Sequence, residues 1–205
     1  MADHISAGPR SPLAGIAIPA LPALRIAERP LVGLVAIAAW PDTVDALAAA
    51  LSREGLPPIP ALRASTTRDD AIAIDAGPGR MLVEAARPDL FAALDSVIPA
   101  EIATVTDLGA ARIALRIEGA RARWVLSKGV AIDLHPDAFP VGMAVTTEIA
   151  HVGVILRRAD ESAYDLYPYR GFARALLDWL IVAGGEDGRP ITGTAPAPRE
   201  NTAAP

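Results

Sequence analysis

The sequence of 205 residues contains no cysteine. Disulfide frames, thiolate metal sites and cysteine nucleophiles are therefore excluded. Aromatic residues make up only 4% of the chain, whereas hydrophobic residues make up 52%. Alanine, valine, leucine and isoleucine must therefore supply most of the packing, and a chain of this length is long enough to bury a core.

The chain also lacks a basic surplus and a long apolar run. Its formal net charge is −5, whereas dedicated nucleic-acid binders usually carry a strong positive surplus. The longest apolar block, residues 31–40, is far shorter than the roughly 20 residues that span a bilayer. Asp3 and His4 stand where a secretion signal would be basic. We therefore expect no nucleic-acid partner, no membrane segment and a cytoplasmic location.

Sequence signatures of common nucleotide and catalytic sites are missing. The chain has no GxxxxGK[ST], GxGxxG, HExxH or GxSxG pattern. Gly77 and Gly79 join two predicted strands instead of preceding a helix, so they do not indicate a dinucleotide site. We therefore expect no cofactor to be bound by this chain alone.

The hydropathy pattern divides the chain into four regions. Residues 1–29 form an apolar, proline-punctuated stretch, predicted to be an irregular arm buried against this chain or a partner. Residues 30–105 and 106–183 are predicted to be an N-terminal and a C-terminal α+β unit. The Gly-, Pro- and Thr-rich residues 184–205 are typical of a disordered tail.

The two middle regions predict the same order of elements. The first has a strand at 31–39, a helix capped by Asp42 and ended by Gly55, a hairpin of strands 71–75 and 80–85, and a helix from Pro88. The second predicts strands at 112–118, 142–149, 151–158 and 163–167 and helices at 120–128 and 169–183. Both orders are close to β-α-β-β-α, so we predict an α+β fold of two ferredoxin-like units.

Asp133, His135 and Asp137 form the sharpest local cluster of potential ligands. Alternate acidic and imidazole side chains suit a metal ion, but Pro136 indicates a loop, where such groups usually cap turns or face water. We favour a turn and keep metal binding as the alternative. His151, at a predicted strand start, is interpreted as a core or interface hydrogen-bonding residue, since no nucleophile partner is identifiable.

Basic and aromatic residues supply further candidates. Five basic positions around the strand at 112–118 predict a patch that is either a solvated face or a contact for an acidic partner or anionic ligand: Arg112, Arg116, Arg121, Arg123 and Lys128. Trp124 and Trp179 are predicted to pack in the core, and Trp40 to lie at an interface. Either Tyr167 or Tyr169 is expected to be buried with its hydroxyl bonded.

Several short segments, in order and spacing, resemble the gamma subunit of heterotetrameric sarcosine oxidase, a small relative of the folate-binding T-protein of glycine cleavage. They are Lys128-Gly129, Asp133-Leu134-His135-Pro136, Phe139-Pro140, His151-Val152-Gly153-Val154, Tyr164 to Tyr167, Arg170 to Ala173 and Trp179-Leu180. The chain departs from the family pattern at Gly171, where a small polar residue is expected. Residues 1–105 match only in general character.

The resemblance implies a T-protein-like fold and a non-catalytic subunit of a four-chain oxidase. That enzyme would demethylate sarcosine to glycine, passing the one-carbon unit to tetrahydrofolate and electrons to oxygen. FAD, FMN, NAD and folate sites would belong to the alpha and beta subunits, and zinc to the delta subunit. No catalytic residue is carried over, so the chain would act in assembly and stability. The candidate motif or interface residues are Trp40, Asp133, His135, Phe139, His151, Tyr167 and Arg170.

Two alternatives stay open at the level of sequence. One is the corresponding subunit of a related N-methyl amino-acid dehydrogenase, such as one acting on N-methylglutamate. The other is an independent folate-binding one-carbon protein. The missing acidic folate-handling signature and the low aromatic content count against the second alternative.

Overall fold

The computed structural model describes residues 11–186, which build two five-stranded antiparallel sheets. The N-terminal sheet has the order β3-β4-β5-β2-β6. Its strands are β2 (Gly33–Ala39), β3 (Ser65–Arg68), β4 (Ala71–Asp75), β5 (Arg80–Ala85) and β6 (Ala103–Asp107). The C-terminal sheet has the order β1-β7-β10-β9-β8. Its strands are β1 (Arg25–Arg29), β7 (Ala114–Glu118), β8 (Ala144–Ile149), β9 (Val152–Asp160) and β10 (Ala163–Pro168).

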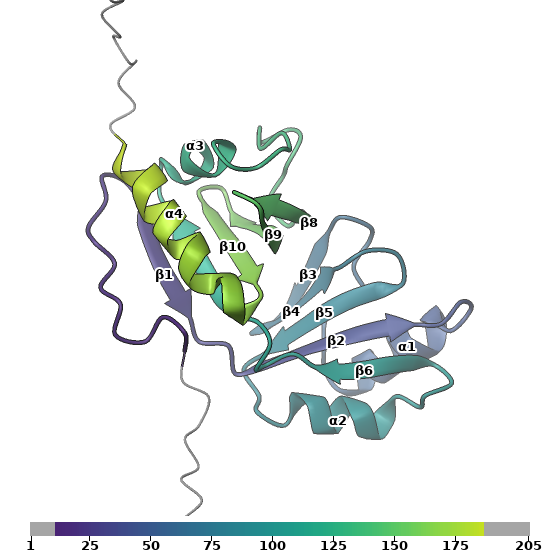
Figure 1. Ribbon diagram of the computed structural model, residues 1–205. Coiled ribbons are helices and arrows are strands. Elements are labelled where there is room, and N and C mark those ends of the chain that lie inside the picture. Colours follow the sequence, from purple (N-terminus) through teal and green to yellow (C-terminus); the bar gives the residue numbers. More distant parts are fainter. Residues whose placement is uncertain (1–10, 187–205) are drawn as a thin grey trace, which may run out of the picture.

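Helices cover the outer face of each sheet (Figure 1). On the N-terminal sheet these are α1 (Val44–Arg53) and α2 (Leu90–Val97), which bury leucines against the strands. On the C-terminal sheet they are α3 (Ala122–Ser127) and α4 (Ala173–Gly185), the latter preceded by the 3-10 turn η1 (Arg170–Phe172). In α4 the buried side chains recur at helical spacing, so one apolar stripe faces the sheet.

A third apolar cluster lies between the two sheets. It joins Leu34, Ile74 and Leu82 of the N-terminal sheet to Ala144, Ile155 and Tyr167 of the C-terminal sheet, among other residues. Backbone contacts connect the β3 and β8 edges, where the Ser65 N–H donates to the Gly142 carbonyl at 2.7 Å. The molecule is therefore layered as helix, sheet, sheet and helix.

The predicted α+β fold of two similar units is confirmed. Each unit has the order strand, helix, three strands, helix, with β3 and β8 as additional edge strands. In the N-terminal sheet β6 follows α2 and pairs with β2. In the C-terminal sheet the corresponding place beside β7 is taken by β1, from the start of the chain.

Part of the predicted irregular arm is therefore ordered sheet. Residues Arg25–Arg29 pair with β7, because alternating Ile26 and flanking polar residues suit a half-buried edge strand. The boundary predicted at 105/106 falls inside β6, which completes the N-terminal sheet. Gly184 and Gly185 belong to α4, while the rest of the predicted disordered tail, from residue 187, lies outside the described residues, as do residues 1–10.

The predicted cap of α1 is wrong. Asp42 adopts a left-handed conformation with φ of 66°, and Thr43 is the N-cap residue. The Thr43 hydroxyl contacts the carbonyl oxygens of Trp40 and Ile102 at 2.8 and 2.7 Å instead of accepting from a helix N–H. Sequence alone did not indicate this because Asp and Thr are both good capping residues.

Within residues 11–186, no helix is both long enough and apolar enough to cross a membrane.

Candidate functional site

A cluster of charged and polar side chains lies between the two sheets, and we call it the seam cluster. Its members come from five strands of both sheets: Arg29 (β1), Glu84 (β5), Arg116 (β7), Arg157 (β9), Asp165 and Tyr167 (β10). Side chains alternate along a strand, so Asp165 and Tyr167 face the N-terminal sheet, while Tyr164 and Leu166 join the helix-side core. The cluster is therefore a polar inclusion beside the apolar contact of the two sheets.

Asp165 is the centre of the cluster and is fully buried. Arg116 donates to its two carboxylate oxygens at 2.8 and 3.0 Å. Arg157 donates to Asp165 Oδ2 at 3.0 Å, and Arg29 donates to Asp165 Oδ1 at 3.2 Å. Arg116 and Arg157 are the register partners of Asp165 on the two neighbouring strands, so pairing in the sheet itself brings these charges together.

Glu84 links the N-terminal sheet to this group. Arg29 binds its two carboxylate oxygens at 2.7 and 2.9 Å, in the fork geometry that suits arginine. The Tyr167 hydroxyl donates to Glu84 Oε2 at 2.6 Å and accepts from Arg29 at 2.9 Å. Ser65 adds a second link between the sheets, because its hydroxyl accepts from Arg157 at 2.9 Å.

Burial sets the electrostatics of the cluster. Removal from water raises the pKa of Tyr167 well above its usual value, and the nearby Glu84 and Asp165 carboxylates raise it further. Burial lowers the pKa of Arg29, but its hydrogen bond to Glu84 and the surrounding negative groups outweigh that effect and raise the pKa overall. The hydrogen bond to Asp165 raises the pKa of Arg116. Arg29 and Arg116 therefore stay charged and Tyr167 stays neutral.

This arrangement of paired charges suits structural cohesion. Each carboxylate of the cluster is held by arginine, so neither is placed to accept a substrate proton. Among residues 11–186, no three metal-ligating side chains converge.

Tyr167 is the buried one of the two candidate tyrosines, as the sequence predicted for one of the pair. Tyr169 is half exposed, and its ring stacks on Arg112, whose guanidinium carbon lies 3.8 Å from the ring centroid. Burial lowers the pKa of Arg112, which donates to the Tyr167 carbonyl at 2.5 Å. Arg170 follows in η1, where its N–H donates to the Ala111 carbonyl at 2.8 Å.

Residues 133–139 form a turn, as the favoured interpretation predicted. The Asp133 carboxylate accepts from the His135 N–H at 2.8 Å, and His135 Nδ1 faces the Asp137 N–H at 3.4 Å. His135 and Asp137 are exposed, and the three ligand types form no metal cluster in the described chain. Phe139 is instead fully buried, 6.4 Å from the Tyr164 ring between centroids.

His151 lies outside the core, so of its two predicted places only an interface stays a prediction. Ala150 and His151 have φ of 49° and 67° and form the two-residue turn between β8 and β9. The His151 side chain is exposed in this turn.

Trp40, the predicted interface residue, is 48% exposed, and its Nε1 donates to the Ala100 carbonyl at 2.6 Å.

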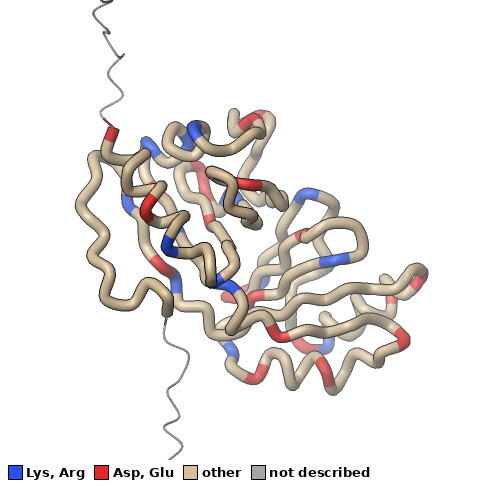
Figure 2. Tube along the Cα trace, in the orientation of Figure 1, with Lys and Arg blue, Asp and Glu red and all other residues tan. Residues whose placement is uncertain are grey.

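The five predicted basic positions do not form one patch, and Figure 2 shows Lys and Arg spread over many elements. Arg116 points into the seam cluster and Arg112 stacks on Tyr169. Arg121 and Lys128 lie over the ring of Trp124. The guanidinium carbon of Arg121 is 4.5 Å from the ring centroid, and Lys128 Nζ is 3.5 Å from it. Trp124 is 37% exposed, so its predicted place in the core is wrong. The half-buried Trp179 packs against Gly129, where an added Cβ would lie 2.6 Å from the indole ring.

Sequence reasoning missed most of the seam cluster. Glu84 and Asp165 each stand among buried residues of a strand, in RMLVEA and AYDLYP. A charge in such a strand requires a buried partner, and that is the signal that could have identified them. The partners themselves lie up to 136 residues away in the sequence, as in the Arg29–Asp165 pair.

Comparison with known proteins adds the family. Residues 79–186 match the model of the sarcosine oxidase gamma subunit family. This chain belongs to that family. The sarcosine oxidase subunit gamma of Corynebacterium sp. (strain U-96) is 37% identical over 111 residues, which are 54% of this chain and 54% of the relative. The sequence match thus spans about half the length of this curated relative.

Structural similarity extends over more of the chain. A chain of the heterotetrameric sarcosine oxidase from Corynebacterium sp. U-96, in complex with pyrrole 2-carboxylate, superposes with a TM-score of 0.78 and 30% identity. The match covers 88% of this chain and 97% of that one. The glycine cleavage aminomethyltransferase T of Bartonella henselae matches with a TM-score of 0.55 and 20% identity, over 78% of this chain and 45% of that chain. The second likeness confirms the T-protein-like fold.

Proposed function

We propose that this chain is the gamma subunit of a heterotetrameric sarcosine oxidase and serves assembly and stability, not catalysis. The observation that carries the proposal is the match along nearly the whole of a sarcosine oxidase chain, at 30% identity and a TM-score of 0.78. A shared fold alone would not support a function, but this match adds sequence identity to the fold.

The proposed partners are the alpha, beta and delta subunits, in the cytoplasm. The complex would demethylate sarcosine oxidatively to glycine, with transfer of the one-carbon unit to tetrahydrofolate and of electrons to oxygen. FAD, FMN, NAD, folate and zinc would be held by the partner subunits. The role of this chain's own residues is to keep two units rigidly joined, since the seam cluster ties both sheets through paired charges.

Exposed apolar side chains are the candidate contacts for assembly. Trp40 and Val44 flank the start of α1, and Tyr169 and Phe172 flank η1, with exposures between 48% and 57%. Large apolar side chains left in water favour burial at an interface, where aromatics are enriched. Trp40 thus remains an interface candidate, whereas Phe139 and Tyr167 are buried and would act through the fold. The interface role predicted for Asp133, His135, His151 and Arg170 also stays a prediction.

Co-expression with the three partner subunits tests the proposal. We expect a stoichiometric complex that contains flavin and consumes oxygen when sarcosine is added. A complex that oxidises N-methylglutamate but not sarcosine would reassign the substrate. A monodisperse chain that ignores the partners and is stabilised by tetrahydrofolate would overturn the proposal in favour of a folate-binding protein.

The variant Phe172→Asp examines the interface at η1. The side chain is 57% exposed, so the isolated chain should keep its melting temperature, while recovery of the complex falls. Val182→Asp is a matched control, because Val182 is also exposed but lies near the opposite end of α4. Equal recovery of both variants would place the interface away from η1.

A further inference from the structure

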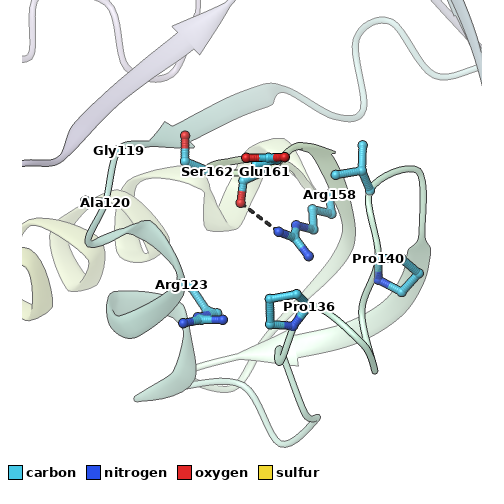
Figure 3. Close-up of a pocket in the computed structure, with 9 residues that line it drawn as sticks. Gly119, Ala120, Arg123, Pro136, Pro140, Arg158, Glu161 and Ser162 are labelled. Carbon is cyan, nitrogen blue, oxygen red and sulfur yellow. Dashed lines mark hydrogen bonds between the residues drawn. The ribbon is translucent and has the colours of Figure 1, made fainter.

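A pocket of about 480 Å³ lies at one end of the C-terminal sheet, on the side covered by α3. Its walls come from the start of α3, the turn between β9 and β10, and the loop before β8 (Figure 3). Pro136 and Pro140, which belong to the segments carrying the family resemblance, form one wall. The pocket is separate from the seam cluster, with which it shares no residue.

The pocket contains a buried arginine without an acidic partner. Arg158 is 5% exposed, and its guanidinium donates to three carbonyl oxygens: Phe139 at 2.8 Å, Glu161 at 2.8 Å and Asp160 at 3.3 Å. Among the described residues it forms no ion pair. A buried charge is costly unless it is paired, and carbonyl dipoles do not neutralise it.

A second cation faces the same space. Arg123 also lines the pocket, and Figure 3 shows the side chains of Arg123, Arg158 and Pro136 around the same opening. Within residues 11–186 the Arg123 side chain forms no hydrogen bond or salt bridge, so its donors are available. The other charged lining residue is the exposed Glu161, which leaves the lining with one cation in excess.

The carbonyl contacts also fix how Arg158 presents its remaining donors. A guanidinium has five N–H groups, and three serve the carbonyls of Phe139, Asp160 and Glu161. The remaining N–H groups are held in one orientation, because the fork is rigid and its anchors are backbone atoms. A preorganised fork of this kind matches the two oxygens of a carboxylate.

We propose that this pocket binds a single carboxylate group between Arg123 and Arg158. The loop with Pro136 and Pro140 then has a binding role, because it shapes the wall and supplies the Phe139 carbonyl that orients Arg158. The carboxylate comes either from an acidic side chain of a partner subunit or from a small free acid. The site itself rests on this chain alone and does not depend on the proposed function.

Titration of the full-length chain with acetate, followed by NMR of the arginine Nε–Hε groups, tests the site. We expect saturable shifts confined to Arg123 and Arg158. Arg123→Gln should weaken acetate binding at least about tenfold, the loss expected for one charged hydrogen bond. Arg174→Gln should leave the affinity unchanged, because Arg174 lies on α4 in an exposed pair with Asp178.

Two results would overturn the site. One is a linear, unsaturated response that is equal at Arg25 and Arg174; the other is an unchanged affinity in Arg123→Gln. Arg158→Lys provides a second variant that keeps the charge but loses the fork, and it should weaken acetate binding while the spectrum stays dispersed. Failure of the partner assembly would not alter any of these results.

Phenylglyoxal modification of Arg123, read by peptide mass mapping, distinguishes the two sources in the assembled complex. If a partner side chain fills the pocket, Arg123 is protected in the complex without acetate, and Arg123→Glu reduces assembly. If the pocket takes a free acid, Arg123 in the complex is modified rapidly until acetate is added. Rapid modification that acetate does not slow, in the complex and in the isolated chain alike, would contradict both.

Discussion

The two units have the same arrangement of strands, and each has a buried acidic residue on its central strand. The units differ in where the arginines that bind this acid come from. In the C-terminal sheet Asp165 on β10 is flanked in register by Arg116 and Arg157. In the N-terminal sheet Glu84 on β5 is flanked by Leu34 and Ile72. Asp165 thus finds its cations within its own sheet, whereas Glu84 obtains Arg29 from the opposite unit.

The difference also concerns the edge strand that completes each sheet. The N-terminal sheet is completed by β6, from the chain that directly follows α2. The C-terminal sheet is completed by β1, in which Arg25 pairs with Glu118 across a distance of 93 residues in the sequence. The same strand supplies Arg29 to the seam cluster, so the C-terminal unit and the contact between the units depend on one segment.

The largest expected effect comes from removing β1. A chain that begins at residue 31 loses Leu24 and Ile26 from the helix-side core and Arg29 from both carboxylates. We expect its C-terminal unit to lose cooperative unfolding, measured by near-ultraviolet circular dichroism in urea. A peptide of residues 11–30 should restore the transition in trans, whereas the same peptide with Ile26→Asp should not. Unaltered cooperativity without β1 would contradict the dependence on this strand.

Asp165→Asn is the next largest expected effect. It leaves three arginines around a neutral group inside the protein, and breaking a buried pair in this way costs about 3–5 kcal/mol of unfolding free energy. The measurement is equilibrium unfolding in urea. Asp178→Asn, in the exposed pair with Arg174, should cost no more than about 0.5 kcal/mol. A similar loss of unfolding free energy in Asp165→Asn and Asp178→Asn would contradict the special role of the buried Asp165.

Gly119→Ala tests the close approach of the arm to the C-terminal unit. Gly119 has φ of 118°, and an added Cβ would lie 2.4 Å from the Ala23 carbonyl oxygen. Backbone strain and the clash together should lower the unfolding free energy by about 2–4 kcal/mol. Gly153→Ala is the control, because open space surrounds that position in β9 and its φ is not positive. Equal melting temperatures of both variants would argue against this contact.

Tyr167→Phe should have the smallest effect at neutral pH, about 1 kcal/mol for the loss of its bond to Glu84. Its effect on pH dependence is more specific. Burial raises the pKa of Tyr167 in the folded chain, so only the unfolded chain releases this proton above about pH 10. The unfolding free energy therefore falls as pH rises above that value, and Tyr167→Phe should make this fall less steep.

Urea unfolding at pH 8 and at several points above pH 10 measures this change. Tyr164→Phe offers a comparison, because burial also raises the pKa of Tyr164 but its hydroxyl has no hydrogen-bond partner among the described residues. Tyr164→Phe should make the unfolding free energy fall less steeply above pH 10, and it should change the unfolding free energy little at neutral pH. An identical slope in Tyr167→Phe and the parent chain would contradict the assignment.

Local patterns were sufficient for most elements. The turn residues between two apolar runs predicted the hairpin of β4 and β5, and the alternation of apolar residues predicted β7. The helical spacing of apolar residues predicted α1 and α4. Errors occurred where local choices were nearly equivalent. Asp42 and Thr43 are both capping residues, and His151 beside valine reads as strand although it occupies a two-residue turn. Trp124 was predicted to pack in the core because its ring is apolar, but the ring is partly exposed and Arg121 and Lys128 lie over it.

The sequence by itself determined the α+β class, the duplicated order of elements and the family resemblance, because periodicity and short motifs are local properties of the chain. Only the tertiary structure decided that β1 completes the distant sheet and that Asp165 gathers three arginines. It likewise decided that Arg123 and Arg158 share a pocket. These are pairings between segments far apart in sequence, and their energies depend on burial and geometry that no local pattern records.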